Sequence, residues 1–424
     1  MYKRISRRDG SVIILVPRHE THSVTWEVMY KVGSRHEQRS VNGVSHFIEH
    51  LMFKGTKKRP TTKTLSKELD AVGAEYNAFT GKDHTSYYIM TDAGHIELGV
   101  DMLSDMLRNS KFEKKEMERE RGVIVEELNM YRDNPMMRID EIFESVIFKG
   151  APLGWEIGGP RSVIKTVPHE ALLRFKDAYY YPGNMVLGLA GHFDEKKALK
   201  LINRYFPVRT KKSKAQVKPF HFHQTKPVAT LEYKETDQVQ LMLGFPGYAH
   251  RHRNMNALTL LSIIMGGTMS SRLFINIRER KGLAYVVRSA AEAYEDTGYF
   301  AVHAGLDKGR IYEALAAIRD ELVLVARKGV TREELKRAKD NLRGKLILKF
   351  EKPSTYLSYL MSQELLTNRI DNLEEKLEQF RSVTLEDVNR VARGIIRWPV
   401  VNLALIGPYK NKQKFLKVLA ERPR

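Results

Sequence analysis

The chain has no cysteine and no apolar run long enough to cross a membrane. The first absence excludes disulfide bonds and leaves histidine and carboxylate groups as the ligands of any metal site. The second predicts a protein without a transmembrane helix. The basic N-terminus is followed by one short apolar stretch, 12–16, which is too short for the core of a signal peptide. We therefore expect a first β-strand at this position and a cytoplasmic protein.

The chain has few acidic residues relative to basic ones: it contains 51 Asp and Glu and 71 Lys and Arg, which gives a formal net charge of +20. A strongly basic protein attracts anionic partners over long distances. No nucleic-acid-binding motif accompanies the charge, so a nucleic-acid-binding protein is an alternative that rests on charge alone. We interpret the charge as a solvated surface and do not expect nucleic acid as a partner.

The most informative pattern is H-x-x-E-H, formed by His46, Glu49 and His50. Residues four apart lie on the same face of a helix, so the two imidazoles can hold one metal ion. Glu49 lies beside them and can reach a metal-bound water without being a ligand. Apolar residues at helical spacing predict a buried helix here, namely Val44, Phe47, Ile48, Leu51 and Met52. This order of residues is typical of the inverted zinc peptidases, although so short a motif also arises by chance.

A zinc site of this kind needs a third protein ligand on another element. The segment 118–131 has a helical pattern and contains two candidates, Glu126 and Glu127. Neighbouring residues on a helix point about 100° apart, so only one of the two can face the metal. The residues alone leave the choice between them open.

Glu127 follows His50 after 76 intervening residues (127 − 50 − 1) and ends an E-R-x-V-I-x-E-E segment. This arrangement resembles the M16, or pitrilysin-type, zinc metallopeptidases, and most closely their short branch, which includes mitochondrial processing peptidase and its bacterial relatives. Further matches lie at 46–56, 77–80, 152–154, 181–185, 267–274 and 278–285. The resemblance implies one zinc ion per chain, held by His46, His50 and Glu127. Glu120 precedes Glu127 by seven residues, close to two helical turns, so it should lie on the same face. We therefore expect Glu120 to orient a ligand or shape the local electric field; a solvated charge is the alternative.

The resemblance further implies where a peptide is held. Asn77, Ala78 and Phe79 match the family's edge strand, which pairs with extended peptides through its backbone. Arg278 and Tyr285 match an Arg–Tyr pair that reaches the substrate near the zinc ion. Arginine offers donors to a peptide carbonyl, and a tyrosine hydroxyl can donate to the developing oxyanion. The alternative for these residues is an ordinary strand and ordinary surface or packing positions.

A chain of 424 residues is expected to form two domains. The Lys-rich segment 208–227 lacks helical periodicity and contains two prolines, so we interpret it as a linker between domains 1–207 and 228–424. Weak repeats, such as the strand patterns at 22–32 and 238–245, indicate a duplicated unit. Together with the resemblance, they predict an α+β fold of two similar α/β-sandwich domains. The second domain lacks the metal motif and contributes the Arg–Tyr pair.

The resemblance implies a zinc-dependent metalloendopeptidase that hydrolyses extended or unfolded peptides inside a clamp-like cavity, with Glu49 as the general base. The family builds this cavity from two such chains or from one chain of double length. Because this sequence carries both the zinc residues and the Arg–Tyr pair, we expect a homodimer; the alternative is a heterodimer with a second M16 subunit. The alternative function is a non-catalytic or co-catalytic subunit of a heteromeric M16 peptidase, which the intact His46, Glu49, His50 and Glu127 argue against.

Overall fold

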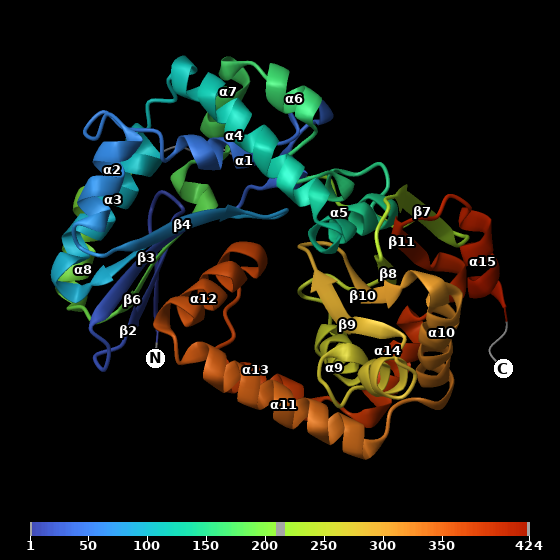
Figure 1. The fold of residues 1–424 in the computed structure, drawn as a ribbon. Coiled ribbons are helices and arrows are strands. Elements are labelled where there is room, and N and C mark those ends of the chain that lie inside the picture. The colour runs from blue at the N-terminus through green and yellow to red at the C-terminus, as the bar shows by residue number, and fades with distance from the viewer. Residues whose placement is uncertain (1, 209–216, 422–424) are drawn as a thin grey trace. The chain divides into compact units, whose positions relative to one another are not determined.

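The computed structural model describes residues 2–208 and 217–421, so residues 209–216 of the expected linker lie outside the described residues. The chain divides into two compact units, each with a sheet and helices (Figure 1). Unit 1 contains Met1–Leu128, Trp155–Lys218 and Ile347–Asn372, and unit 2 contains Asn129–Gly154, Pro219–Leu346 and Leu373–Arg424. Each unit therefore takes up one segment from the other half of the chain. The linear division into domains 1–207 and 228–424 stays a prediction.

Unit 1 contains a six-stranded sheet with the strand order β1-β2-β6-β3-β5-β4. β2 and β6 run parallel, and the other neighbouring strands run antiparallel. The strands are β1 (Lys3–Ser6), β2 (Val12–Pro17), β3 (Ser23–Tyr30), β4 (Glu75–Thr80), β5 (Thr85–Asp92) and β6 (Met185–Gly191). The apolar stretch 12–16 is thus a strand as predicted, but it is the second strand, because the preceding residues 3–6 pair with it.

Helices cover both faces of the unit 1 sheet. Trp26 of β3 donates a hydrogen bond to the carbonyl of Ile96 in α3 at 2.9 Å, whereas the next residue, Glu27, accepts one from Ser358 of α12 at 2.6 Å. Successive strand residues point to opposite faces, so α3 and α12 lie on opposite faces. The helices are α1 (Val44–Leu51), α2 (Thr62–Asp70), α3 (Ile96–Asn109), α6 (Arg161–Thr166), α7 (His169–Tyr179), α8 (Glu195–Tyr205), α12 (Pro353–Thr367) and most of α4 (Lys114–Asp133).

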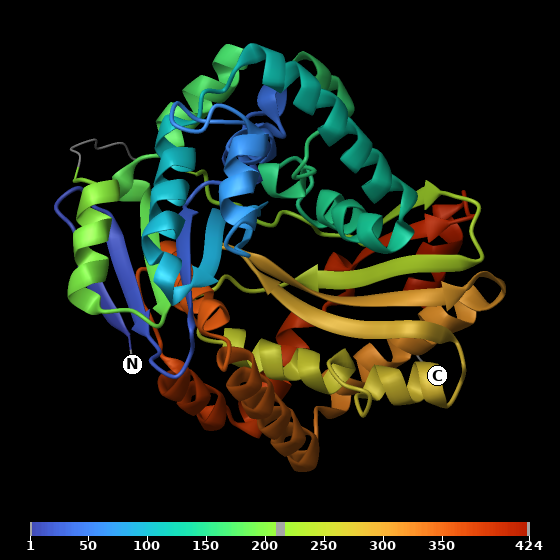
Figure 2. The same ribbon diagram turned by 60° about the vertical axis from the view of Figure 1, so that its left-hand side comes forward.

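Unit 2 contains a five-stranded sheet with the order β7-β11-β8-β10-β9. β7 and β11 run parallel and the other neighbours antiparallel, and Figure 2 shows the long hairpin of β9 and β10 beside β8. The strands are β7 (Val228–Tyr233), β8 (Gln238–Pro246), β9 (Ala284–Ala293), β10 (Gly298–Asp307) and β11 (Asn402–Gly407).

The unit 2 sheet is also covered on both faces. Leu243 of β8 lies in a core with α9, α10 and α14, whereas its neighbour Met242 lies in a second core with Phe143 of α5. The helices are α5 (Pro135–Ile147), α9 (Met255–Gly266), α10 (Ile311–Lys328), α13 (Leu373–Ser382), α14 (Leu385–Ile395), α15 (Lys412–Ala420) and most of α11 (Arg332–Phe350). Both units thus have several helices on one face and a helix from the other half of the chain on the second. The predicted α+β fold with two similar units is confirmed.

Short helical turns connect many of these elements. They are η1 (Ser34–His36), η2 (Arg39–Val41), η3 (Ala93–His95), η4 (Pro152–Gly154), η5 (Pro182–Asn184), η6 (Phe274–Glu279), η7 (Lys308–Arg310) and η8 (Trp398–Val400). In the described part of the chain, none of the helices has both the length and the apolar character that a membrane crossing requires.

Candidate metal centre

Helix α1 carries the H-x-x-E-H motif, and its apolar stripe fixes which way the motif points. The helix places four side chains fully in the core of unit 1: Val44, Phe47, Ile48 and Leu51. His46, Glu49 and His50 lie off this stripe and are only partly buried. The apolar stripe can face the core in only one rotation of the helix. Packing of the stripe therefore fixes the direction in which the three polar side chains point, away from the core.

The ligand atoms of His46, His50 and Glu127 converge. His46 Nε2 lies 3.2 Å from His50 Nε2, and Glu127 Oε2 lies 3.3 Å from His50 Nε2 and 3.7 Å from His46 Nε2. Ligands that hold zinc tetrahedrally at about 2.0–2.2 Å are about 3.3–3.6 Å from one another, so the three atoms fit one zinc ion. Glu126 does not belong to this group, which is the one such cluster among the described residues. The geometry favours Glu127 over Glu126.

Glu120 lies behind His50, on the far side of the imidazole from Glu127. One carboxylate oxygen, Oε1, is 2.9 Å from His50 Nδ1, and the other, Oε2, is 2.6 Å from Lys54 Nζ. The residue is only 3% exposed. A carboxylate at Nδ1 keeps the proton on that nitrogen and leaves the Nε2 lone pair for a metal. The contact with His50 and the near-complete burial favour a ligand-orienting role for Glu120 over a solvated charge, and the role itself stays a prediction.

The surroundings shift the pKa values of the two histidines in opposite directions. Burial, together with the neighbouring His50, lowers the pKa of His46 to about 4, so this imidazole is neutral at pH 7. Burial also acts to lower the pKa of His50, but hydrogen bonds to Glu120 and Glu127 outweigh it and raise the pKa to about 9. A metal ion that binds here must therefore displace a proton from His50.

Glu49 lies outside the ligand group and is held by Thr80. The Thr80 hydroxyl donates a short hydrogen bond to Glu49 Oε2. Burial raises the pKa of the Glu49 carboxyl above its ordinary value, although the bond from Thr80 and the charge of His50 oppose the shift. A carboxyl whose pKa is moved toward neutrality is suited to accept and return a proton at pH 7.

The N-terminus of α1 is held by Glu37, which no sequence pattern had indicated. Its buried carboxylate accepts hydrogen bonds from the backbone N–H groups of Gly43 at 2.7 Å and Ser45 at 2.8 Å, and from the side-chain amide of Asn42 at 2.8 Å. Burial raises the pKa of Glu37 to about 7, against these hydrogen bonds. An acid this far before a helix is not a regular N-cap, so only the fold reveals its role.

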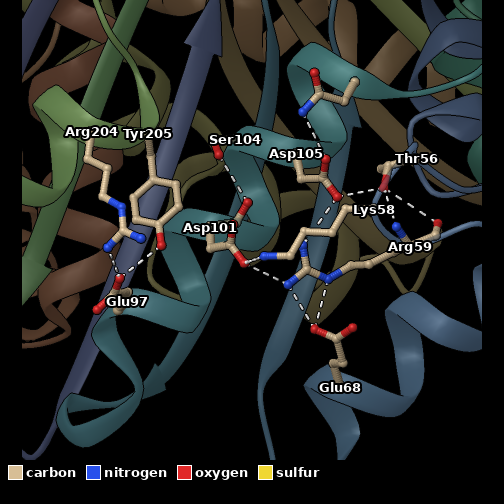
Figure 3. Close-up of polar contacts among 11 residues, drawn as sticks. Thr56, Lys58, Arg59, Glu68, Glu97, Asp101, Ser104, Asp105, Arg204 and Tyr205 are labelled. Carbon is tan, nitrogen blue, oxygen red and sulfur yellow. Dashed lines mark hydrogen bonds and ion pairs between the residues drawn. The ribbon is translucent and has the colours of Figure 1, made fainter.

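The segment after α1 is fixed by a buried arginine (Figure 3). Arg59 is 2% exposed and lies 2.8 Å from Asp101, 3.2 Å from Asp105 and 2.8 Å from Glu68. The two aspartates belong to α3 and the glutamate to α2, so the arginine joins the segment that follows α1 to these two helices. A buried charge requires such partners, yet in the sequence nothing distinguishes Arg59 from the other basic residues.

The predicted peptide-binding segment forms β4, which the structure places at the edge of the unit 1 sheet. Glu75, Asn77 and Phe79 are exposed, and Phe79 is 45% exposed. Ala78 lies between them and is half-buried against the core. The edge position leaves one side of the backbone of β4 without a strand partner in the described chain, which is what peptide pairing requires. Peptide binding by these residues stays a prediction.

Arg278 and Tyr285 are neighbours in unit 2. Arg278 lies in the π-helical turn η6, and its guanidinium carbon is 4.8 Å from the ring centroid of Phe274 and 5.6 Å from that of Tyr285. Tyr285 lies on the edge strand β9 and is 71% exposed. The two side chains thus form a pair, and their action on a substrate stays a prediction.

Comparisons with known proteins agree with this geometry. The family model described as "Insulinase (Peptidase family M16)" matches residues 12–161, which include all of the ligand group, and the model "Peptidase M16 inactive domain" matches 166–342. The chain is 33% identical to the uncharacterized zinc protease YmxG of Bacillus subtilis, over 97% of this chain and 99% of that protein. It is 34% identical to an uncharacterized zinc protease of Streptomyces coelicolor, over 97% and 90%.

The fold is shared as well. The crystal structure of a protease from Helicobacter pylori matches with a TM-score of 0.88 at 23% identity, over 96% of this chain and 99% of that one. The chain belongs to the M16 family of peptidases, and the resemblance stated from the sequence is confirmed.

Proposed function

We propose that the protein is a zinc-dependent metalloendopeptidase that hydrolyses extended or unfolded peptides. The observation that carries the proposal is the convergence of one ligand atom each from His46, His50 and Glu127 within 4.8 Å of one another. Glu49 lies beside this group without belonging to it. Membership of the M16 family and relatives named as zinc proteases support the proposal.

In this proposal, each residue has a separate task. His46, His50 and Glu127 hold the ion, and Glu120 keeps Nε2 of His50 directed at it by binding Nδ1. When bound, zinc polarises a peptide carbonyl and makes a water molecule more acidic. Glu49 accepts a proton from the attacking water and returns it to the departing amine.

The edge strand β4 is the proposed peptide-binding element. The backbone along Asn77, Ala78 and Phe79 pairs with a substrate that adopts an extended conformation, which favours unfolded peptides over folded proteins. For this pairing the Ala78 N–H exchanges its hydrogen bond to Oδ1 of Asn77, at 2.8 Å, for one to the substrate. Arg278 is proposed to donate to a substrate carbonyl and Tyr285 to the developing oxyanion. The exposed ring of Tyr285 beside the Arg278 guanidinium supports the pairing of these two donors.

We further propose that two copies of the chain associate as a homodimer and that the protein acts in the cytoplasm. The support for a homodimer is that one chain supplies both the zinc group and the Arg–Tyr pair, so no second kind of subunit is needed. Sedimentation of the active protein as a monomer would contradict this part of the proposal.

The test of the peptidase function is hydrolysis of a mixed set of quenched fluorescent peptides, with and without zinc, beside the variant Glu49→Gln. We expect zinc-dependent cleavage that this variant lowers by about 10²–10⁴-fold, while it still binds one zinc ion per chain. Glu127→Gln should lose both zinc and activity, and the matched variant Glu126→Gln should keep both. Full turnover by Glu49→Gln, or no cleavage by zinc-loaded wild type, would refute the proposal.

A further inference from the structure

Thr80 connects two parts of the site that the proposed function treats separately. It is the last residue of β4, the strand proposed to hold the peptide, and it pairs with Thr85 of β5. Its hydroxyl donates to Oε2 of Glu49 on helix α1. The hydrogen bond therefore joins the edge strand directly to the carboxylate that is proposed to move the proton.

The strand presents this hydroxyl in a fixed direction. Along β4, Tyr76, Ala78 and Thr80 alternate with exposed residues and lie half-buried on one face. On that face Tyr76 stacks on Phe53, just beyond the end of α1, with ring centroids 6.4 Å apart. A β-branched side chain in a strand is restricted at χ1, so the backbone of the edge strand determines where the Thr80 hydroxyl points.

Glu49 depends on this contact for its orientation. Among the described residues, Thr80 supplies the hydrogen bond to the Glu49 carboxylate, and no other side chain is seen to donate one. A glutamate side chain has three rotatable torsions, so an unrestrained carboxylate samples several positions. A proton-transfer group must stay within hydrogen-bond reach of the reacting atoms to be effective.

We propose that Thr80 is a positioning residue for Glu49: its hydroxyl holds the carboxylate in place and sets it in register with a peptide paired to β4. This inference rests on the proposed peptidase function. It predicts that the rate of the chemical step depends on a hydroxyl at position 80, whereas zinc binding and peptide binding do not.

The decisive variant is Thr80→Val, which keeps the β-branched shape and removes the hydroxyl. We expect one zinc ion per chain, an unfolding temperature and KM close to those of the wild type, and a kcat lower by about 10- to 100-fold, as for loss of a hydrogen bond to a charged group. Thr80→Ser restores the hydroxyl and should recover most of the lost kcat. Zinc is measured by elemental analysis, so metal loss is detected independently of activity.

Thr85→Val is the matched control. It removes a buried hydroxyl at the paired position of β5, where Thr85 donates to the carbonyl of Val32 at 2.7 Å and not to Glu49. We expect this variant to lower the unfolding temperature without a comparable fall in kcat.

Three results would overturn the inference while leaving the peptidase function intact. They are a Thr80→Val enzyme with wild-type kcat, a loss confined to KM, and a Thr80→Ser enzyme as slow as Thr80→Val. The proposed function itself fails if wild-type protein shows no zinc-dependent cleavage that Glu49→Gln abolishes, and the inference then fails with it. Because wild type and Glu49→Gln are assayed beside the Thr80 variants, the two failures are distinguishable.

Discussion

Replacing Glu120 by glutamine tests how much this carboxylate, which binds Nδ1 of the proposed ligand His50, contributes to metal binding. The Glu120 side chain is almost fully buried, and its two oxygens bind His50 Nδ1 and Lys54 Nζ. Burial acts to raise the pKa of Glu120, but these two partners outweigh it and lower the pKa, so the group is ionised at pH 7. Glutamine has nearly the same size but no charge, and its single carbonyl oxygen cannot occupy both acceptor positions.

Loss of such a partner typically lowers metal affinity by about 10- to 100-fold, which corresponds to about 1.4–2.7 kcal/mol. We expect Glu120→Gln to lie in the upper part of this range, because His50 and Lys54 lose the same carboxylate. Competition with a chromophoric zinc chelator near neutral pH measures the affinity. The control is Glu118→Gln, an exposed glutamate of the same helix that pairs with Arg121, and it should change the affinity by less than about twofold. Equal affinities for Glu120→Gln and wild type would refute the assigned role.

Two further predictions concern the scaffold of unit 1. Arg59→Met removes the guanidinium from Asp101 and Asp105 and should lower the free energy of unfolding by about 3–5 kcal/mol. Arg204→Met removes an exposed ion pair of the same region (Figure 3) and should lower the free energy of unfolding by less than about 1 kcal/mol. Urea unfolding measures both variants, and equal losses of unfolding free energy would contradict the prediction. Burial raises the pKa of Glu27 in the folded state, so the stability it contributes is present at low pH and is lost as the pH rises through that pKa. The unfolding temperature should therefore fall more steeply in wild type than in Glu27→Gln as the pH rises above the ordinary pKa of a glutamate, and parallel profiles would argue against it.

Helix α1 and its candidate ligands could be predicted from the sequence because the spacing that relates them lies within a single helix. His46, Glu49 and His50 share one face in any α-helix, and the apolar stripe beside them indicates which face is buried. The choice between Glu126 and Glu127 is different, because it depends on how α4 is rotated relative to α1. Spacing within α4 does not contain that information. The family resemblance supplied the choice of Glu127, and the converging ligand atoms agree with it.

Thr80, Glu37 and Arg59 could not be predicted because tertiary packing sets their partners. Thr80 reaches a residue 31 positions earlier in the chain, and Arg59 binds aspartates 42 and 46 positions later. Residues of these types are common in the sequence, with 71 Lys and Arg in all, and no local pattern marks the few that become buried. What identifies them is full or partial burial together with the groups that their polar atoms bind, and both appear only in the fold.

The covering helix of each sheet illustrates the same limit at a larger scale. α5 lies in the first half of the chain and packs on the unit 2 sheet, and α12 lies in the second half and packs on the unit 1 sheet. Periodicity shows that a helix has an apolar face, but not which sheet that face will cover. The sequence therefore suggests two consecutive domains, whereas each compact unit includes one segment from the other half of the chain.

The two units have a similar arrangement of helices on a sheet, yet among the described residues only unit 1 contains a candidate metal-binding group. α1 lies beside the edge strand β4 in unit 1, and α9 lies beside the edge strand β9 in unit 2. α1 leaves its three polar motif residues outside its apolar stripe, whereas α9 buries apolar side chains around most of its circumference, including Ala257, Leu258, Leu260, Leu261, Ile264 and Met265. A helix that is apolar on nearly all sides is packed on nearly all sides, and α9 contains no histidine or carboxylate that could hold an ion. The arrangement that the two units share requires only that helices pack on a sheet. Our proposal assigns hydrolysis to unit 1 because α1 carries the polar motif residues that α9 lacks.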